Sequence, residues 1–314
     1  MMGSRAPDPS QLRTANAVER WPKFRFLAIA EEPVLPIGAD EAIGGGLWRR
    51  VFLTDFEDQP ASWTQLERSK YLSRDRKTFY KFEGYGHFGA EIGQRARVLE
   101  QTGFGPRYLG SEDGFSKYEV VGGSLLHQRD LSTDVLKTMA RYCAMRADNF
   151  LVKPREESKL QEMLAWNWKC EFQEELPRHS LEVERLVIAD GRLLPHEWIA
   201  SGGRLLKLDG CSHGDDHFFP GPCDIAWDIA GAIVEWGMDR HTSEYFVDAY
   251  VRESGDQIRR RLYPYLVAYA TFRMAWSKMA AHASEGEFDQ QLLERDYQRY
   301  RAICKTLKDV AVAA

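Results

Sequence analysis

Charged and titratable side chains are concentrated at the end of a short apolar segment, in the sequence RLLKLDGCSHGDDH at residues 204–217. The residues concerned are Asp209, His213, Asp215, Asp216 and His217. Carboxylates and imidazoles so close together compete for protons or repel one another unless a metal ion, a phosphate group or solvent compensates their charge. The pattern therefore indicates a metal site, a phosphate site or a solvated loop.

The two histidines and a neighbouring aspartate form a donor set that suits zinc or manganese, because both ions accept nitrogen and oxygen ligands. These ligands would come from a loop, however, which lacks the fixed ligand spacing of a helix. We therefore expect a solvated loop that shapes the mouth of a substrate or nucleotide site, with metal binding by His213 and His217 as the alternative. The acidic residues Asp215 and Asp216 favour a cationic substrate.

A β-hairpin is predicted to position the start of this cluster. The apolar segments EWIAS and RLLKLD are joined by Gly202 and Gly203, and two glycines between short apolar segments are typical of a hairpin turn. Asp209 is thus expected directly after the second strand of the hairpin and ahead of a glycine.

The first 120 residues are predicted to be rich in strands. Gly44, Gly45 and Gly46 form a turn before LWRRVFLTDF (47–56), whose alternation predicts a strand. The segment TFYKFEG predicts a second strand that contains Lys81, and FSKYEVV predicts a third. Between these two strands, apolar residues at helical spacing over 89–102 predict a helix that carries Glu91.

The chain becomes helical after the break at Gly122 and Gly123. Ser132 or Thr133 can cap the first helix, and Ser158 has capping-box spacing before the second. Further helical patterns follow the hairpin, over 224–237, 242–253, 259–283 and 290–307. We expect three regions: a flexible leader over 1–20, an N-terminal lobe over 21–121 and a helical C-terminal lobe over 122–314.

The composition describes a folded globular chain. It has 314 residues, 44% of them hydrophobic and 28% charged, with a net charge of −5, which argues against general affinity for nucleic acid or anionic membranes. The five cysteines are scattered, so neither a disulfide framework nor a zinc ribbon is indicated. Neither a signal peptide nor a membrane span is predicted, and we expect a cytoplasmic protein.

The order of these features fits phosphoryl transfer. A glycine-rich turn lets backbone N–H groups approach phosphates, a strand lysine neutralises them, and a helix carboxylate fixes that lysine. Carboxylates beyond the hairpin can then hold magnesium. Each feature is common by itself, but their order is specific.

The sequence resembles the aminoglycoside phosphotransferase and choline kinase-like branch of the protein-kinase-like fold over residues 40–285. The similar segments are IGGGLWRRVFL, TFYKFEG, GFGPRYLG, DGFSKYEVVGG, LLKLDG and PGPCDIAWDIAGAIVEWG. The resemblance implies an α+β, bilobal kinase-like fold with a small β-rich N-terminal lobe and a larger helical C-terminal lobe. It also implies ATP or GTP and Mg²⁺ as cofactors, with a small-molecule acceptor as the partner.

The resemblance assigns roles to individual residues. It implies that Asp209 binds magnesium and that Asp228 braces the catalytic loop. Lys81 corresponds to the lysine that pairs with phosphates, with Glu91 as its helix partner. The nucleotide-covering turn corresponds to Gly44, Gly45 and Gly46.

The catalytic loop departs from the family, because His-Gly-Asp followed five residues later by Asn is absent. The equivalent stretch is IADGRLLPHEWIASGGRLLKLDG, in which Asp190 is our candidate for orienting the acceptor hydroxyl or accepting its proton. Glu197 is the second candidate magnesium ligand, because a hard cation prefers carboxylate oxygen to imidazole. A different alignment places Arg192 at the catalytic position, which leaves no base there and predicts a degenerate kinase.

The resulting expectation is a kinase that transfers the γ-phosphoryl group of a nucleoside triphosphate to a hydroxyl of a small, cationic acceptor. Two alternatives stay open. One is a catalytically silent kinase-like module that binds a nucleotide or a protein, and the other is nucleotidyl transfer on the same fold.

Overall fold

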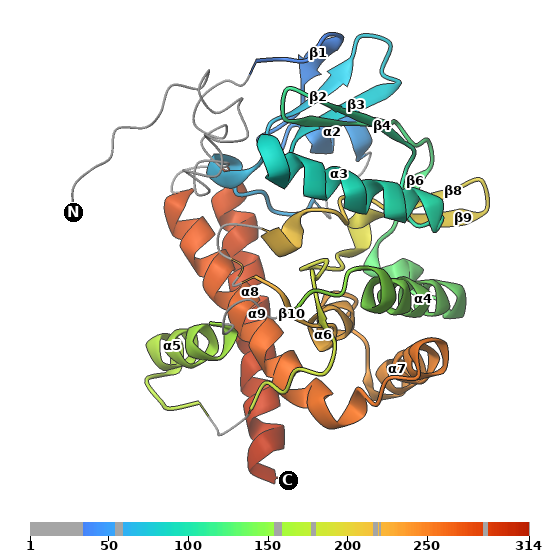
Figure 1. The fold of residues 1–314 in the computed structure, drawn as a ribbon. Helices are drawn as coiled ribbons and strands as arrows, with labels where there is room; N and C mark the ends of the chain where they lie inside the picture. Colours follow the sequence, from blue (N-terminus) through green and yellow to red (C-terminus); the bar gives the residue numbers. More distant parts are fainter. Residues whose placement is uncertain are drawn as a thin grey trace. The chain divides into compact units, whose positions relative to one another are not determined.

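The structure is a computed structural model that describes residues 34–53, 59–153, 159–176, 180–215, 219, 221–284 and 288–313. The chain divides into two compact units, Met1–Gly123 and Ser124–Ala314 (Figure 1). Among the helices in these described ranges, none is both long enough and apolar enough to cross a membrane.

The first unit is built on a five-stranded antiparallel sheet with strand order β1-β2-β3-β5-β4. The strands are β1 (Ala39–Ala42), β2 (Lys70–Ser73), β3 (Thr78–Phe82), β4 (Tyr108–Glu112) and β5 (Phe115–Glu119). Helix α3 (Gly86–Gln101) packs against β4 and β5. Buried Tyr80, Phe82 and Phe115 form an aromatic core on the sheet. The predicted strands around Lys81 and over FSKYEVV are confirmed by β3 and β5.

The predicted strand over 47–56 is wrong in the part that the structure describes, because Trp48–Phe52 form the short helix α2. The buried side chain of Arg49 folds back on the glycine turn and donates hydrogen bonds to the carbonyl oxygens of Gly46 (3.0 Å) and Pro60 (2.8 Å). These bonds favour a helical backbone, since an extended strand would carry the guanidinium away from Gly46. Alternating side chains alone could not reveal this contact.

The second unit combines two small sheets with six helices among its described residues. Strands β6 (Ser124–Leu125), β8 (Trp198–Ser201) and β9 (Arg204–Lys207) form one sheet, and β7 (Leu186–Val187) pairs with β10 (Cys223–Asp224). The helices are α4 (Thr133–Asn149), α5 (Leu160–Phe172), α6 (Ala226–Glu235), α7 (Arg240–Ser254), α8 (Arg259–Ala283) and α9 (Phe288–Ala313). The predicted hairpin is confirmed by β8 and β9, and the oxygen of Ser132 accepts from the N–H of Val135 as the predicted cap of α4. The predicted cap Ser158 lies outside the described residues.

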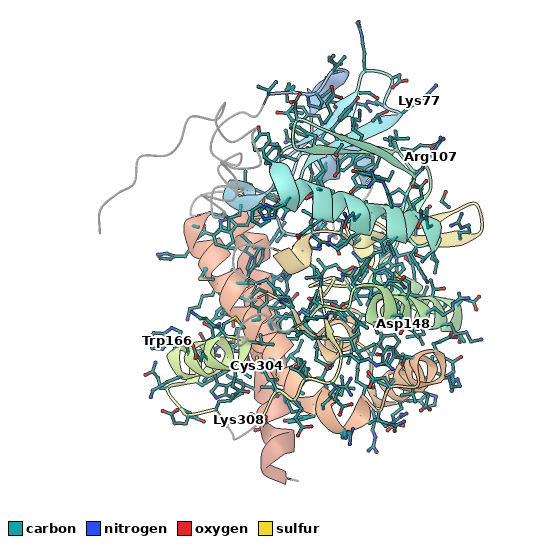
Figure 2. The ribbon with its side chains drawn as sticks, in the orientation of Figure 1. Lys77, Arg107, Asp148, Trp166, Cys304 and Lys308 are labelled. Carbon is teal, nitrogen blue, oxygen red and sulfur yellow. The ribbon has the colours of Figure 1, made fainter. Side chains whose placement is uncertain are left out.

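Helix α8 is the centre of the helical packing, since it contacts α5, α6 and α9 (Figure 1). Four tryptophans in this unit are fully buried, namely Trp168, Trp198, Trp227 and Trp236. On the outside, Trp166 of α5 is 70% exposed, whereas Cys304 of α9 is buried with its Sγ 3.8 Å from the hydroxyl of Thr271 (Figure 2).

A carboxylate on α5 links that helix to its two neighbours. Glu171 accepts hydrogen bonds from Lys278 of α8 (2.7 Å) and from Tyr297 (2.7 Å) and Arg301 (2.6 Å) of α9. Burial raises the pKa of Glu171, but these three donors outweigh burial and hold the pKa below its ordinary value of 4.5.

Candidate functional site

Helix α6 braces the backbone of residues 188–197, the loop that is predicted from the sequence to be catalytic. The carboxylate of Asp228, near the start of α6, accepts hydrogen bonds from the backbone N–H groups of Asp190 (2.9 Å) and Gly191 (3.1 Å). Burial raises the pKa of Asp228 to about 6, although Arg146 and the two N–H donors oppose that shift. Asp228 therefore occupies the bracing position that the resemblance assigns to it.

Two buried indoles, one in α6 and one directly after it, donate hydrogen bonds to carbonyl groups of the same loop. Trp227 donates from Nε1 to the oxygen of Gly191 (3.0 Å), and Trp236 donates from Nε1 to the oxygen of Leu193 (2.9 Å). Donors and acceptors of the loop main chain are thus paired with a rigid helix.

Arg146 of α4 joins this loop to the segment that follows the hairpin. Its buried guanidinium donates to the carbonyl oxygens of Ile188 and Gly210, both at 2.7 Å, and to the hydroxyl of Tyr142 at 3.0 Å. It also lies 3.4 Å from the carboxylate of Asp228. One side chain therefore fixes both segments that carry the candidate site residues.

Asp190 is enclosed by cations and by a phenol. Its side chain is fully buried, with Oδ1 3.4 Å from Nζ of Lys207 and Oδ2 3.8 Å from Nη1 of Arg146, and it accepts a short hydrogen bond from Tyr142. Burial raises the pKa of Asp190, but Lys207, His213 and Arg146 more than reverse this and hold it well below its usual range. Such a carboxylate stays charged and is a weak proton acceptor.

Glu197 has a cation on each carboxylate oxygen. Its Oε2 accepts from Nζ of Lys207 at 2.9 Å, and its Oε1 lies 3.0 Å from Nε of Arg192. Burial raises the pKa of Glu197, but Lys207 and Arg192 hold it below its ordinary value. Both oxygens that the sequence assigns to magnesium are thus occupied by the chain's own cations.

Asp209 directly follows β9, as predicted, and has an unusual backbone. Its φ of 55° lies in the left-handed region, which costs a residue other than glycine about 1–3 kcal/mol and is most frequent at functional sites. Its Oδ2 lies 3.2 Å from Nε2 of His213, and that nitrogen lies 2.9 Å from Nη2 of Arg192.

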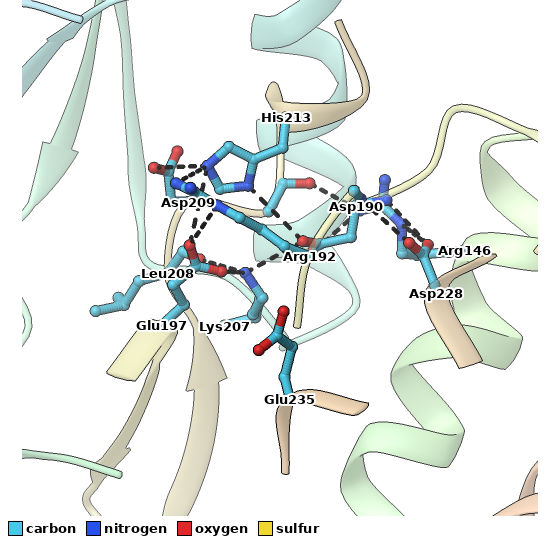
Figure 3. Close-up of polar contacts among 12 residues, drawn as sticks. Arg146, Asp190, Arg192, Glu197, Lys207, Leu208, Asp209, His213, Asp228 and Glu235 are labelled. Carbon is cyan, nitrogen blue, oxygen red and sulfur yellow. Dashed lines mark hydrogen bonds and ion pairs between the residues drawn. The ribbon is translucent and has the colours of Figure 1, made fainter. Parts of the chain in front are cut away.

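These side chains form one charge cluster within the second unit (Figure 3). We define the charge cluster as Arg146, Asp190, Arg192, Glu197, Lys207, Asp209, His213 and Asp228. Only two of its side chains reach solvent appreciably: Arg192 is 29% exposed and Asp209 is 22% exposed, whereas the others are at most 7% exposed. The chemically accessible groups of the cluster are therefore one guanidinium and one carboxylate.

The backbones on either side of the cluster approach too closely for extra side chains. A Cβ atom on Gly214 would lie 2.4 Å from the carbonyl oxygen of Ala189, and one on Gly191 would lie 3.0 Å from Cβ of His213. This close approach brings His213 against Asp190. The remaining residues of the predicted loop contribute nothing to the described geometry, because Asp216 and His217 lie outside the described residues and the side chain of Asp215 is not described.

The candidate nucleotide residues lie in the first unit. Lys81 is buried on β3 with Nζ 3.3 Å from Oε1 of Glu83, which also pairs with Arg68. Glu91 occupies an exposed position on α3. Its pairing with Lys81 stays a prediction.

The glycine turn of the first unit has an acidic neighbour. The backbone N–H of Gly46 donates to Oε2 of Glu67 at 2.5 Å, and both Gly45 and Gly46 have left-handed backbones, as the turn requires. Gly44 completes this turn. Its contact with a nucleotide stays a prediction.

Of the two predicted magnesium ligands, Asp209 and Glu197, only Asp209 has surroundings that suit the ion. Magnesium binds one or two protein carboxylates and keeps several waters or phosphate oxygens. Asp209 fits this requirement, because its carboxylate is partly exposed at the end of the hairpin. Glu197 does not fit, because Lys207 and Arg192 already neutralise its two oxygens.

Arg146 and Lys207 were not predicted as site residues, although the sequence contains a signal for each of them. Arg146 lies three and four residues after the buried residues Cys143 and Tyr142 of α4, a spacing that places it on the apolar face. Lys207 lies two residues after Leu205 in a strand of the hairpin, so it shares a face of the strand with an apolar residue. A cation at a core position requires buried carboxylates as partners.

Comparisons with known proteins define the fold. No protein-family model matches the chain, and no curated protein matches its sequence. The chain is similar in structure to an ethanolamine kinase from Plasmodium vivax, with 12% identity and a TM-score of 0.51 over 76% of this chain and 80% of that one. It is also similar to a choline kinase from Cryptosporidium parvum (11% identity, TM-score 0.52, 82% and 90% coverage) and to a spectinomycin phosphotransferase in complex with ADP and spectinomycin (11%, 0.51, 82% and 91%).

The chain therefore has a kinase-like α+β fold. More particularly, it is the fold of small-molecule kinases such as choline kinases, ethanolamine kinases and aminoglycoside phosphotransferases.

Proposed function

We propose that the chain is a nucleotide-dependent phosphotransferase that acts on a hydroxyl group of a small acceptor. The observation that carries this proposal is the partly exposed carboxylate of Asp209, held in a left-handed backbone at the end of a hairpin and next to a braced loop. A strained, accessible carboxylate on a rigid support is typical of a functional position. The fold, which the chain shares with small-molecule kinases, supports the same class of reaction.

In this proposal, Asp209 binds magnesium, and the metal would neutralise phosphate charge. The partly exposed guanidinium of Arg192 suits phosphoryl oxygens, because its planar donors pair with two oxygens at once. Within the first unit, Lys81 and the turn of Gly44, Gly45 and Gly46 are the proposed phosphate-binding groups. Phosphoryl transfer depends mainly on positioning and charge stabilisation, so it does not require a strong base.

The burial of Asp190 supports a positioning role for this residue. Its carboxylate is surrounded by Tyr142, Arg146 and Lys207 and lacks access to solvent. Proton acceptance from an acceptor hydroxyl by Asp190 would require these contacts to open.

The burial of Asp190 also favours a second candidate function, a kinase-like module that binds a nucleotide without transferring phosphate. Arg192 cannot act as a base, because a guanidinium stays protonated at physiological pH. The second candidate predicts nucleotide binding with no phosphorylated product.

The test begins with nucleotide binding. Thermal unfolding of the full chain is followed with ATP or GTP, each with and without magnesium, because a ligand that binds only the folded state raises the unfolding temperature. Asp209→Asn should remove most of the magnesium-dependent rise. Asp113→Asn is the matched control, since Asp113 also has a left-handed backbone (φ 49°) but is exposed in the first unit. An unchanged magnesium effect in Asp209→Asn would contradict the assigned ligand.

Phosphoryl transfer is then measured with γ-labelled nucleotide and a panel of small acceptors. The panel starts with choline, ethanolamine and spectinomycin, the acceptors named for the structurally similar kinases. A labelled product that is lost in Asp209→Asn supports the phosphotransferase. Magnesium-dependent nucleotide binding without any product or nucleotide hydrolysis supports the silent module.

A further inference from the structure

We propose that Lys207 is a built-in substitute for a metal ion and that it fills a latent transition-metal site formed by Asp190, Glu197 and His213. Removal of the Lys207 charge should open this site to one manganese or zinc ion. The inference concerns the inner part of the charge cluster and holds whether or not the chain transfers phosphate.

The surroundings of Lys207 resemble the coordination of a cation. Its Nζ lies 2.9 Å from Oε2 of Glu197, 2.8 Å from the carbonyl oxygen of Leu208 and 3.4 Å from Oδ1 of Asp190 (Figure 3). An ammonium group has three donors, and here three oxygens from three different residues surround it. The side chain is fully buried, so water cannot take the place of these oxygens.

The same region contains the ligand atoms of a metal site. One donor atom each from Asp190, Glu197 and His213 lies within 4.8 Å of the other two. The two nitrogens of His213 are 3.9 Å from Asp190 Oδ1 and 3.9 Å from Glu197 Oε1, respectively. A tetrahedral ion with ligands at about 2.0–2.2 Å holds its donor atoms roughly 3.5 Å apart, so donor atoms that now lie up to 4.8 Å apart would move together by about 1 Å to complete the site.

Two buried atoms in this group lack hydrogen bonds within the part of the chain that the structure describes. They are Oδ1 of Asp190 and Nδ1 of His213, and both residues are more than nine-tenths buried. Buried polar atoms are nearly always hydrogen-bonded. These two atoms lie 3.9 Å apart, and Oδ1 of Asp190 also lies 3.4 Å from the Lys207 ammonium, so their spacing admits an ion in place of that ammonium.

The charges explain why the ammonium and a metal ion exclude each other. Lys207 and Arg192 already neutralise the charges of Asp190 and Glu197, and a divalent ion in the same space would add two positive charges about 3 Å from the ammonium. Repulsion at that distance is strong in a buried environment. An uncharged side chain at position 207 removes the repulsion and takes one positive charge away from two buried carboxylates. Arg146, 3.8 Å from Asp190, and Arg192, 3.0 Å from Glu197, remain as their cationic partners, and the lost charge favours uptake of a cation.

The experiment compares Lys207→Met, which keeps the length of the side chain, with Lys207→Arg, which keeps the charge. Each purified full-length variant is stripped with a chelator and titrated with Mn²⁺ alone and Zn²⁺ alone by calorimetry. We expect Lys207→Met to bind one equivalent more than the parent, and Lys207→Arg to bind the same number as the parent. The extra Mn²⁺ should show nitrogen hyperfine coupling from an imidazole in its electron paramagnetic resonance spectrum, and His213→Gln should abolish both the coupling and the extra equivalent.

Stability gives an independent measurement. Mn²⁺ at a hundred times its dissociation constant should raise the unfolding temperature of Lys207→Met by about 5 °C or more, with no such rise in Lys207→Met/Glu197→Gln, which lacks one ligand. Recovery of folded Lys207→Met only in the presence of Mn²⁺ or Zn²⁺ would also support the proposal. A folded Lys207→Met that binds no additional ion would overturn it. So would a Lys207→Met that stays unfolded with either ion while the double variant folds.

Discussion

Arg146 gives the most demanding test of how the candidate site is held together. We expect Arg146→Met to lower the free energy of unfolding strongly, because methionine retains the apolar stem but provides none of the donors. The substitution leaves the carbonyl oxygens of Ile188 and Gly210 without the bonds that Arg146 donates at 2.7 Å. It also removes the cation 3.4 Å from Asp228.

The magnitude follows from these contacts. Breaking a buried ion pair by removing one partner costs about 3–5 kcal/mol, and each buried acceptor that loses its donor costs about 1–3 kcal/mol. The contributions are not additive, because the groups share one network. We expect a loss of about 4 kcal/mol or more, which is a large fraction of the roughly 5–15 kcal/mol that stabilises a typical domain.

The assay is urea unfolding of the full chain, followed by tryptophan fluorescence and circular dichroism. Arg146→Lys retains the charge but only part of the hydrogen bonding, so its free energy of unfolding should fall less than that of Arg146→Met. This variant also keeps the test possible if Arg146→Met does not fold. Arg240→Met is the matched control, because the Arg240 side chain is 93% exposed and its change should stay within about 0.5 kcal/mol. A loss below about 1 kcal/mol for Arg146→Met would refute the assigned role.

Two further predictions concern backbone approach and pH. Gly214→Ala should lower the free energy of unfolding by about 1–3 kcal/mol, because its Cβ would lie 2.4 Å from the oxygen of Ala189. Urea unfolding measures this, with Gly122→Ala as the control, since a Cβ on Gly122 meets nothing within 4 Å. Equal free energies of unfolding for the two variants would contradict the prediction. Glu171→Gln should destabilise the chain at pH 7, and the difference from the parent should disappear as the pH falls well below 4.5. The sign of the effect follows from the pKa of Glu171, which is lower in the folded state than its ordinary value of 4.5. The charged carboxylate therefore stabilises the folded state above pH 4.5, and this stabilisation is lost as the pH falls through the pKa of the folded state. Urea unfolding at pH 7 and pH 3 measures this difference, with Glu174→Gln at an exposed position as the control. A loss of stability in Glu171→Gln that is the same at both pH values would contradict the ion-pair explanation.

The architecture of the second unit could be predicted from sequence because its signals are local. The cap Ser132, the hairpin glycines Gly202 and Gly203 and the long helical patterns each depend on residues near one another in the chain. The short helix α2 could not be predicted in this way. Its conformation depends on Arg49 reaching Gly46 and Pro60, and Pro60 lies eleven residues after Arg49 in the sequence.

The site was predictable only in part for a related reason. The positions of Asp209, just after β9, and of Asp228, in the first turn of α6, could be predicted because each follows from a familiar order of elements. The partners of Asp190 and Glu197 could not, since lysine and arginine are mostly exposed and their burial here depends on carboxylates far away in sequence. The pairing of Lys207 with Glu197, ten residues earlier, exists only because the hairpin brings the two together.

The grip of α6 on the backbone of loop 188–197 has a consequence for evolution and design. Because Asp228, Trp227 and Trp236 contact main-chain atoms of the loop, these contacts hold the loop whichever side chains it presents to solvent. Side chains at its accessible positions can therefore change without the loss of the loop conformation. Such a loop is a natural place to exchange one chemistry for another, and Arg192, whose side chain is 29% exposed, is the position at which an acidic group can be installed on a support that is already rigid.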